Sequence, residues 1–177
     1  MREVRLRSAA GTEEGLWNTI RDALRDSTCL KTHTAAGIVK EDKLLSIGFN
    51  LCAPDSQGYG RLPSACPRME ITTGTGYELC SPIHAEVMSC LNIRPDRHPA
   101  ELGKFAGHLS LGKDEILSAF TESELNLLNG STLYLVGHYW ACENCTYVAK
   151  TVGVSEIKLD AITSEETKKA YESRKLA

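Results

Sequence analysis

The pattern of hydrophobic and polar positions predicts alternating helices and strands. In residues 12–26 the apolar side chains recur at helical spacing, Thr12 is a suitable N-cap, and two glutamates occupy the first turn. Two strand-like runs follow at 34–39 and 44–49, joined by a short polar turn. The N-terminal part of the chain therefore predicts one helix and then a β-hairpin.

The second half of the chain continues this alternation. The capping box Thr121-x-x-Glu124 lies inside one helical region and predicts a break there. Ser164 is the expected cap of a polar C-terminal helix. The expected helices and strands are 83–93 (helix), 113–129 (helix), 132–136 (strand), 142–151 (helix) and 156–159 (strand). This order indicates an α/β fold, with a mixed sheet and helices on both faces.

Two segments have no such periodicity. Residues 51–82 are rich in proline and glycine and contain three cysteines, and residues 94–112 are also irregular. A structureless loop as long as the first is unusual in a compact domain, and is normally functional or held by something such as a metal.

Length and composition limit the class of protein. The chain has 177 residues and a mass of 19.4 kDa, which predicts a single domain over residues 1–177. A net charge of −3 argues against binding of long nucleic acid but allows a single nucleotide. No apolar stretch has the length of a signal peptide or a membrane span, so a cytoplasmic protein without membrane contact is expected.

The seven cysteines are the unusual feature of the composition. An odd number cannot be fully paired within one chain. The count therefore favours metal ligands or free thiols over a disulfide framework.

Two short motifs together describe a catalytic zinc site. His84-Ala85-Glu86 and Cys142-Glu143-Asn144-Cys145 each open a predicted helix. Alone, the first motif is weak evidence for a functional site, and the second is typical of either a zinc site or a redox site. Together they supply one imidazole and two thiolates, and catalytic zinc takes three protein ligands with a fourth position for water. The two cysteines lie one turn apart at a helix N-terminus, where the helix dipole favours thiolates.

Glu86 is expected to transfer protons and not to bind the metal. It lies roughly 200° around the helix from His84, which places it beside the open position. Zinc with two thiolates and a neutral imidazole has no net charge, and the pKa of its bound water falls to about 7. The Glu86 carboxylate is placed to take a proton from that water.

These motifs resemble those of the zinc-dependent cytidine and deoxycytidylate deaminases, which have His-x-Glu followed by Pro-Cys-x-x-Cys. Ser27-Thr-Cys-Leu-Lys-Thr-His-Thr-Ala-Ala-Gly-Ile-Val and Gly48-Phe49-Asn50 resemble the deoxycytidylate branch, as do Gly76-Tyr77-Glu78 and Ser131-Thr-Leu-Tyr-Leu. The resemblance implies a three-layer α/β/α cytidine-deaminase-like domain. It also implies a homo-oligomer that catalyses the zinc-dependent hydrolytic deamination of a cytosine nucleotide. Conversion of dCMP to dUMP is the first candidate for this reaction.

The resemblance also suggests how a substrate is held. It gives Asn50 a contact with the sugar and places Lys31 near the phosphate, although a surface lysine is the alternative reading. Arg68 is a second candidate for the phosphate. Tyr139 and Trp140 offer aromatic faces on which a base can stack, or else they simply pack within their loop.

The chain departs from the family pattern in two places. Ala141 stands where the family has proline, which donates no ligand, so zinc binding should persist. His84 and Cys142 are separated by 57 residues, more than the family needs, so residues 94–128 are predicted to be an insertion.

A second group of candidate ligands lies mainly in the irregular segment. A structural zinc that holds this segment is one interpretation; buried free thiols and solvent-exposed histidine are the other. Cys90 is expected in the core, and Cys29 either in the core or at the pocket edge. The candidates for the second zinc are Cys52, Cys66, Cys80 and His98.

Three other functions stay open. The enzyme could deaminate another base, a nucleoside or a modified nucleotide. Trp140-Ala-Cys142-x-x-Cys145 also faintly resembles the active site of a thiol–disulfide oxidoreductase. That site normally comes early in its domain, and the 32 residues after Cys145 are too few to complete such a fold. A non-catalytic zinc module would not need Glu86 and would prefer four protein ligands.

Overall fold

The computed structural model describes residues 12–52, 65–71, 75–76, 79–97, 99–106 and 111–175. For residues 99, 100 and 170–175 it describes the backbone alone. The helices are α1 (Glu13–Asp22), α2 (Ala85–Leu91), α3 (Pro99–Leu102), α4 (Lys113–Ser118), α5 (Glu122–Leu128), α6 (Glu143–Thr151) and α7 (Ala161–Lys175). The strands are β1 (Ala35–Lys40), β2 (Lys43–Phe49), β3 (Thr132–Val136) and β4 (Glu156–Leu159), and two 3₁₀ turns are η1 (Ala23–Asp26) and η2 (Gly103–Phe105).

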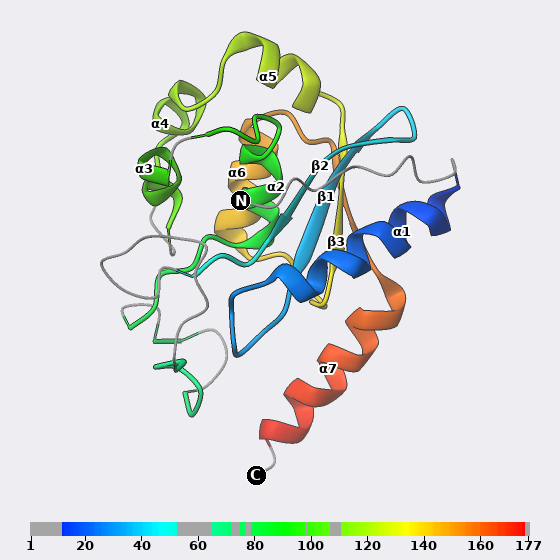
Figure 1. Cartoon of the computed structure of the whole chain (residues 1–177), viewed down its shortest axis with the longest axis vertical. Helices are drawn as coiled ribbons and strands as arrows, with labels where there is room; N and C mark the ends of the chain where they lie inside the picture. Colours follow the sequence, from blue (N-terminus) through cyan, green and yellow to red (C-terminus); the bar gives the residue numbers. More distant parts are fainter. Residues whose placement is uncertain are drawn as a thin grey trace.

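The strands form one mixed sheet in the order β2-β1-β3-β4 (Figure 1). β1 is antiparallel to both β2 and β3, whereas β3 and β4 are parallel. The parallel pair requires a crossover, and α6 supplies it between β3 and β4.

Alternation along the strands gives the sheet two buried faces. In β1, Ile38 packs on the side of α2 and α6, while Val39 packs on the side of α1. In β3, Leu133 and Leu135 face α2 and α6, and Tyr134 faces α1. Helices therefore cover both faces, and the predicted α/β class with a mixed sheet in three layers is confirmed.

Most of the predicted elements are present. Thr12 caps α1 by accepting a hydrogen bond from Gly15 N. The hairpin closes through a turn in which Glu41 and Asp42 both have positive φ, as a two-residue type I′ connection requires. The predicted break of helix 113–129 is confirmed, because the Thr121 capping box begins a separate helix, α5.

Two local predictions were wrong. Residues 94–112 are not wholly irregular, because they contain α3 and η2. The last helix begins at Ala161, so Ser164 lies inside its first turn and does not cap it. Asp160 has that role, since its carboxylate accepts hydrogen bonds from the N–H and the hydroxyl of Thr163.

Helix α2 lies directly on β2. A Cβ atom at Gly48 would stand 2.2 Å from the backbone nitrogen of Ser89, so only glycine allows this approach. Ser46 Oγ donates to Ser89 O at 2.6 Å, and Asn92 Nδ2 donates to Ile47 O at 2.7 Å. These contacts fix the helix that follows His84.

An ion-pair network connects the predicted insertion 94–128 to the other end of α2. The side chain of Arg97 is only 2% exposed and donates to Leu91 O, Ala119 O and the Glu124 carboxylate. Glu124 also accepts from Thr121 N and so completes the capping box of α5. The buried cation is therefore fully engaged, as a buried charge must be.

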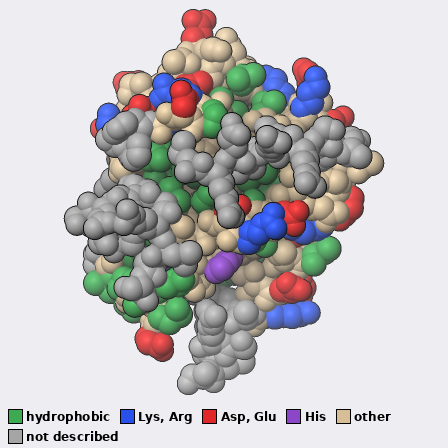
Figure 2. All heavy atoms as spheres, in the orientation of Figure 1, with side chains coloured by type: hydrophobic (Ala, Val, Ile, Leu, Met, Phe, Trp, Pro, Cys, Tyr) green, Lys and Arg blue, Asp and Glu red, His purple; other side chains and the backbone are tan. Residues whose placement is uncertain are grey.

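On the face seen in Figure 2, basic side chains are interspersed with acidic ones among the described residues. Within the described ranges, no helix has both the length and the apolar character needed to cross a membrane.

Arg21 and Asp160 join α1 to the junction of β4 and α7. Arg21 donates to both carboxylate oxygens of Asp160, at 3.1 and 2.7 Å. Burial by itself would raise the pKa of Asp160, but the hydrogen bonds from Arg21 and Thr163 outweigh burial and hold this pKa below its ordinary value of 3.8.

We expect Asp160→Asn to lower the free energy of unfolding by about 2 kcal/mol at pH 7, since it breaks a charge-assisted pair. Because the folded-state pKa is depressed, this stabilisation is present above the ordinary carboxyl pKa. It is lost as the pH falls through the folded-state value. Denaturant unfolding at a series of pH values checks this.

The matched control is Asp26→Asn at an exposed position, with an expected change within about 0.5 kcal/mol. A deficit in Asp160→Asn that stays the same at every pH would contradict the assignment.

Candidate metal centre

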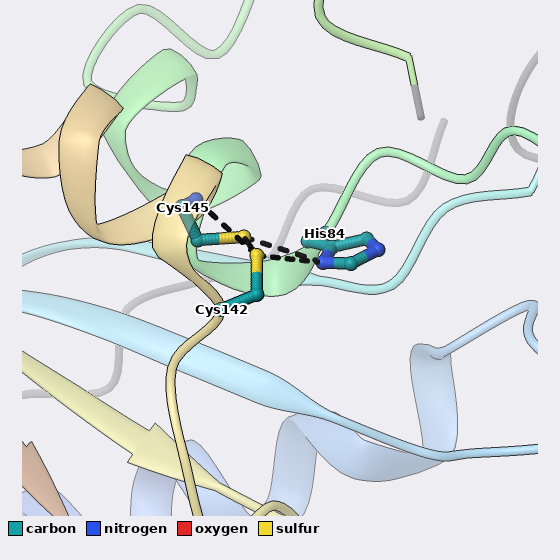
Figure 3. A group of neighbouring side chains, drawn as sticks. All are labelled: His84, Cys142 and Cys145. Carbon is teal, nitrogen blue, oxygen red and sulfur yellow. Dashed lines mark hydrogen bonds between the residues drawn. The ribbon is translucent and has the colours of Figure 1, made fainter. Parts of the chain in front are cut away.

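The N-termini of α2 and α6 bring the three predicted ligands together (Figure 3). His84 is the N-cap residue of α2, with extended backbone angles, and Cys142 is the N-cap residue of α6. Cys145 follows one turn later in α6. The imidazole and both sulfurs point toward one another from these two helix ends.

The ligand atoms are close enough to share one ion. His84 Nδ1 lies 3.7 Å from Cys142 Sγ and 3.2 Å from Cys145 Sγ, and the two sulfurs are 2.7 Å apart. All three atoms lie within 4.8 Å of one another, and both cysteines are free thiols.

This donor set fits zinc. Zinc bonds of about 2.3 Å to sulfur and about 2.0 Å to nitrogen imply ligand atoms roughly 3.5 to 3.8 Å apart in a tetrahedron. The two distances from His84 Nδ1 to sulfur are close to the expected N–S value, whereas the two sulfurs lie about 1 Å nearer to each other than zinc-bound thiolates do. The cysteine side chains would therefore have to move apart to hold the ion. Two thiolates and one imidazole are also the soft and borderline donors that zinc prefers.

The helix end favours charge on Cys142. Its sulfur accepts a hydrogen bond from Cys145 N at 3.2 Å. The hydrogen bond from the Cys145 thiol, and after it the contact with His84, lowers the pKa of Cys142 well below the usual thiol range. The same hydrogen bond, together with burial, raises the pKa of Cys145.

Glu86 is buried beside these ligands without belonging to the group of three. Its side chain is 4% exposed, hydrogen-bonds with Cys145 and interacts electrostatically with His84. Burial raises the pKa of the Glu86 carboxyl. The site therefore combines three side chains that could hold a metal ion with a carboxyl group shielded from solvent.

Comparison with known proteins finds likeness among solved structures but none in sequence. No family model matches the sequence, and no curated protein matches it. Among solved structures, the dCMP deaminase from the cyanophage S-TIM5, in complex with dCMP and dUMP, is similar. It has 16% sequence identity and a TM-score of 0.48, and the match covers 90% of this chain and 89% of that one.

A small cavity lies beside the metal ligands. His84 and Cys145 form part of its wall, and Phe105 and Leu111 of the predicted insertion also line it. Sequence reasoning did not identify these two residues, because an apolar residue in an irregular segment carries no local sign of the site it reaches. The remaining lining residues are Val87, Asn144 and Val148.

Asn50 holds the beginning of α2. Its Oδ1 accepts a hydrogen bond from Ala85 N at 2.9 Å, and its Nδ2 donates to Thr32 O at 3.3 Å. The side chain thus links the end of β2 to the residue directly after His84. The predicted contact of Asn50 with a sugar stays a prediction.

Lys31 stabilises the turn at residues 67–70 through hydrogen bonds. Its ammonium donates to Arg68 O at 2.7 Å and also to Ile71 O. Arg68 is buried and donates from Nε to Thr75 O at 2.9 Å. Neither contact tests the predicted role of Lys31 or Arg68 at a phosphate.

The aromatic side chains before Cys142 stack on one another. His138 stacks on Tyr139 and on Trp140, with ring centroids 5.3 and 5.9 Å apart, and Trp140 is 47% exposed. Burial, and after it the neighbouring His84, lowers the pKa of His138 to about 4. Stacking of Tyr139 or Trp140 on a base stays a prediction.

The second zinc stays a prediction. In the part of the chain that the structure describes, Cys52, Cys66 and Cys80 do not form a group whose sulfur atoms all lie within 4.8 Å of one another. Cys29, which the sequence left between core and pocket edge, is half-buried, and the Cys52 thiol lowers its pKa to about 5. His98 lies outside the described residues.

We expect Asn50→Ala to lower the free energy of unfolding by about 1–3 kcal/mol, because it leaves Ala85 N without its acceptor. Asn50→Asp keeps an acceptor and should recover most of this loss. Asn126→Ala, at an exposed position, is the control with an expected change within about 0.5 kcal/mol. Denaturant unfolding distinguishes the variants; equal stability of Asn50→Ala and the unchanged protein would exclude the capping role.

Proposed function

We propose that this protein catalyses the zinc-dependent hydrolytic deamination of a cytosine nucleotide, with dCMP as the first candidate substrate. One observation carries the proposal. The buried Glu86 carboxyl lies against the three-ligand group of His84, Cys142 and Cys145. A hydrolytic deaminase needs these two components next to each other.

Three side chains hold the ion in this proposal: His84 through Nδ1, and Cys142 and Cys145 through Sγ. When bound, zinc supplies Lewis acidity, which makes a coordinated water acidic near neutral pH. The three protein ligands leave the fourth position free for that water.

Glu86 moves the protons. It accepts one proton from the water that attacks C4 of the pyrimidine and delivers it to N3. It then accepts the remaining proton of the hydroxyl group at C4 and delivers it to the departing amine. A C–O bond forms at C4, the C–N bond breaks, and the products are a uracil nucleotide and ammonia. Because Glu86 is buried, it exchanges these protons with the substrate and not with bulk water.

Support for a nucleotide substrate comes from the residues around the centre. The segment that includes Lys31 and Asn50 resembles the deoxycytidylate branch of the family, and Trp140 presents an exposed aromatic face next to Cys142. Another base, a nucleoside or a modified nucleotide remains the alternative substrate.

The geometry favours this chemistry over the other two classes. A thiol–disulfide oxidoreductase needs Cys142 and Cys145 but has no use for a buried Glu86 or for an imidazole within 3.7 Å of both sulfurs. A structural zinc would prefer a fourth protein ligand to an adjacent, non-ligating carboxyl.

We expect Glu86→Gln to lower kcat/KM by about 10²–10⁴-fold, the usual contribution of a general acid–base group. Its zinc content should equal that of the unchanged protein, because Glu86 is not a ligand. Glu122→Gln, at an exposed position in the first turn of α5, is the control and should keep full activity.

Ammonia release is measured with dCMP, CMP, dCTP, cytidine, 5-modified dCMP and the adenine and guanine nucleotides. Release that persists in Glu86→Gln would refute the role of this carboxyl. No release from any of these compounds by the zinc-loaded protein would refute the deaminase itself.

A further inference from the structure

We propose that Thr163 and Ser164 of α7 are positioning residues, which hold the loop that leads from β3 to Cys142. We call this loop, residues 137–141, the aromatic loop. Without the two hydroxyl groups the loop loses its fixed place, and a nucleotide binds less tightly. The effect on nucleotide binding rests on the proposed function; the effect on the loop does not.

Helix α7 is attached to the rest of the fold by polar side chains. Surface helices are usually held by a stripe of apolar residues. No described side chain of α7 belongs to either hydrophobic core, and Ile162, in its first turn, is 58% exposed. The C-terminal end of the helix extends away from the other elements (Figure 1). The half-buried residues of 161–169 all carry hydroxyl groups: Thr163, Ser164 and Thr167.

Asp160 anchors the first turn of α7. Its carboxylate accepts hydrogen bonds from Arg21 and from the hydroxyl of Thr163, the latter at 2.8 Å. Its N–H donates to Leu135 O at 2.9 Å, which joins the start of the helix to β3. The position of Thr163 is therefore set by α1 and by the sheet.

The Thr163 hydroxyl also binds the aromatic loop. It accepts a hydrogen bond from Gly137 N at 2.9 Å while it donates to Asp160. A hydroxyl has one proton, so donation to the carboxylate leaves its oxygen to accept from the loop. Gly137 has a φ of +80°, and a Cβ atom there would lie 2.3 Å from His33 O, so only glycine fits. The first residue of the loop is thus held between the segment before β1 and α7.

Ser164 and Thr167 add contacts to the neighbouring peptide groups. Ser164 Oγ donates to His138 O at 3.3 Å. Thr167 Oγ1 lies 3.3 Å from Gly137 O and 2.8 Å from Thr163 O of its own helix, so it shares one proton between two carbonyls. The hydroxyls of Thr163 and Ser164 therefore make the main contacts between α7 and the loop.

These contacts lie at the beginning of an aromatic stack. The rings of His138, Tyr139 and Trp140 lie within 14° of parallel, and Trp140 Nε1 donates to His138 Nε2 at 3.3 Å. Because the stack is held together internally, the backbone position of His138 sets that of the exposed Trp140 ring. A planar base binds to such a face by stacking. Helix α7 thereby sets where this face lies relative to Cys142.

Loss of these contacts should weaken binding and not the chemical step. A loop that occupies its binding-competent position only part of the time lowers the apparent affinity by that fraction. Glu86 and the candidate metal ligands lie outside residues 137–141, so the rate of the chemical step should stay the same. The expected signature is a higher KM at constant kcat.

The first experiment follows the loop without any nucleotide. The chain has two tryptophans, so Trp17→Phe leaves Trp140 as the single one. In this background we expect Thr163→Val combined with Ser164→Ala to shift the emission to longer wavelength and to lower its anisotropy. Thr163→Ser keeps the hydroxyl and should behave like the parent. Thr19→Val is the matched control, because it removes a half-buried hydroxyl that donates within α1.

Unchanged emission and anisotropy in the double variant would overturn the proposal, as would an equal change in Thr19→Val. If the double variant does not fold, Ser164→Ala alone gives the test, because it keeps the hydrogen bond between Thr163 and Asp160. It should cause a smaller shift in the same direction, and no shift would overturn the proposal.

The second experiment measures ammonia release from dCMP by the zinc-loaded protein. We expect the double variant to raise KM about 3- to 10-fold, the value of about one hydrogen bond, with kcat and zinc content unchanged. A lower kcat at constant KM would refute the positioning role in nucleotide binding. No turnover by the unchanged protein would instead refute the proposed function, and the fluorescence result would still decide whether α7 holds the loop.

Discussion

The close packing of α2 on β2 is the constraint on which the rest of the molecule depends. Gly48 leaves no room for a side chain between the strand and the helix backbone, and Ser46 hydrogen-bonds to the helix across this contact. At the N-terminal end of the helix, Asn50 accepts the hydrogen bond of Ala85 N. These contacts position the start of the helix, where His84 contributes its imidazole to the candidate metal site.

The second half of the centre is positioned independently. β3 lies beside β1 in the middle of the sheet and leads through the aromatic loop to Cys142 at the start of α6. Because α2 and α6 pack on the same face, their N-termini meet, and the positive ends of both helix dipoles favour thiolates there. Glu86 enters the same place from the first turn of α2, where burial removes it from solvent.

The region on either side of α2 has two different kinds of support. After the helix, Arg97 and Glu124 hold the predicted insertion through a buried ion pair, which places Phe105 and Leu111 over the cavity next to His84. Before the helix, the bridge between Leu51 and Ile83 joins the chain that leads into His84 to the residues that follow β2.

Features that depend on neighbouring residues can be predicted from the sequence alone. The Thr12 cap, the hairpin, the capping box at Thr121 and the one-turn spacing of Cys142 and Cys145 could all be predicted, because each is local chemistry within a few residues. The motif containing His84 and Glu86 could be joined to the cysteines only because zinc chemistry requires that combination.

Which distant groups meet depends on how the chain folds. The hydrogen bond from Ala85 N to Asn50, the capping of α7 by Asp160 and the placement of Phe105 at the cavity all depend on strand register and helix packing. A thiol in the core, in a pocket wall or in a metal site has the same local sequence signal. Only the folded chain shows which other thiols lie within its reach.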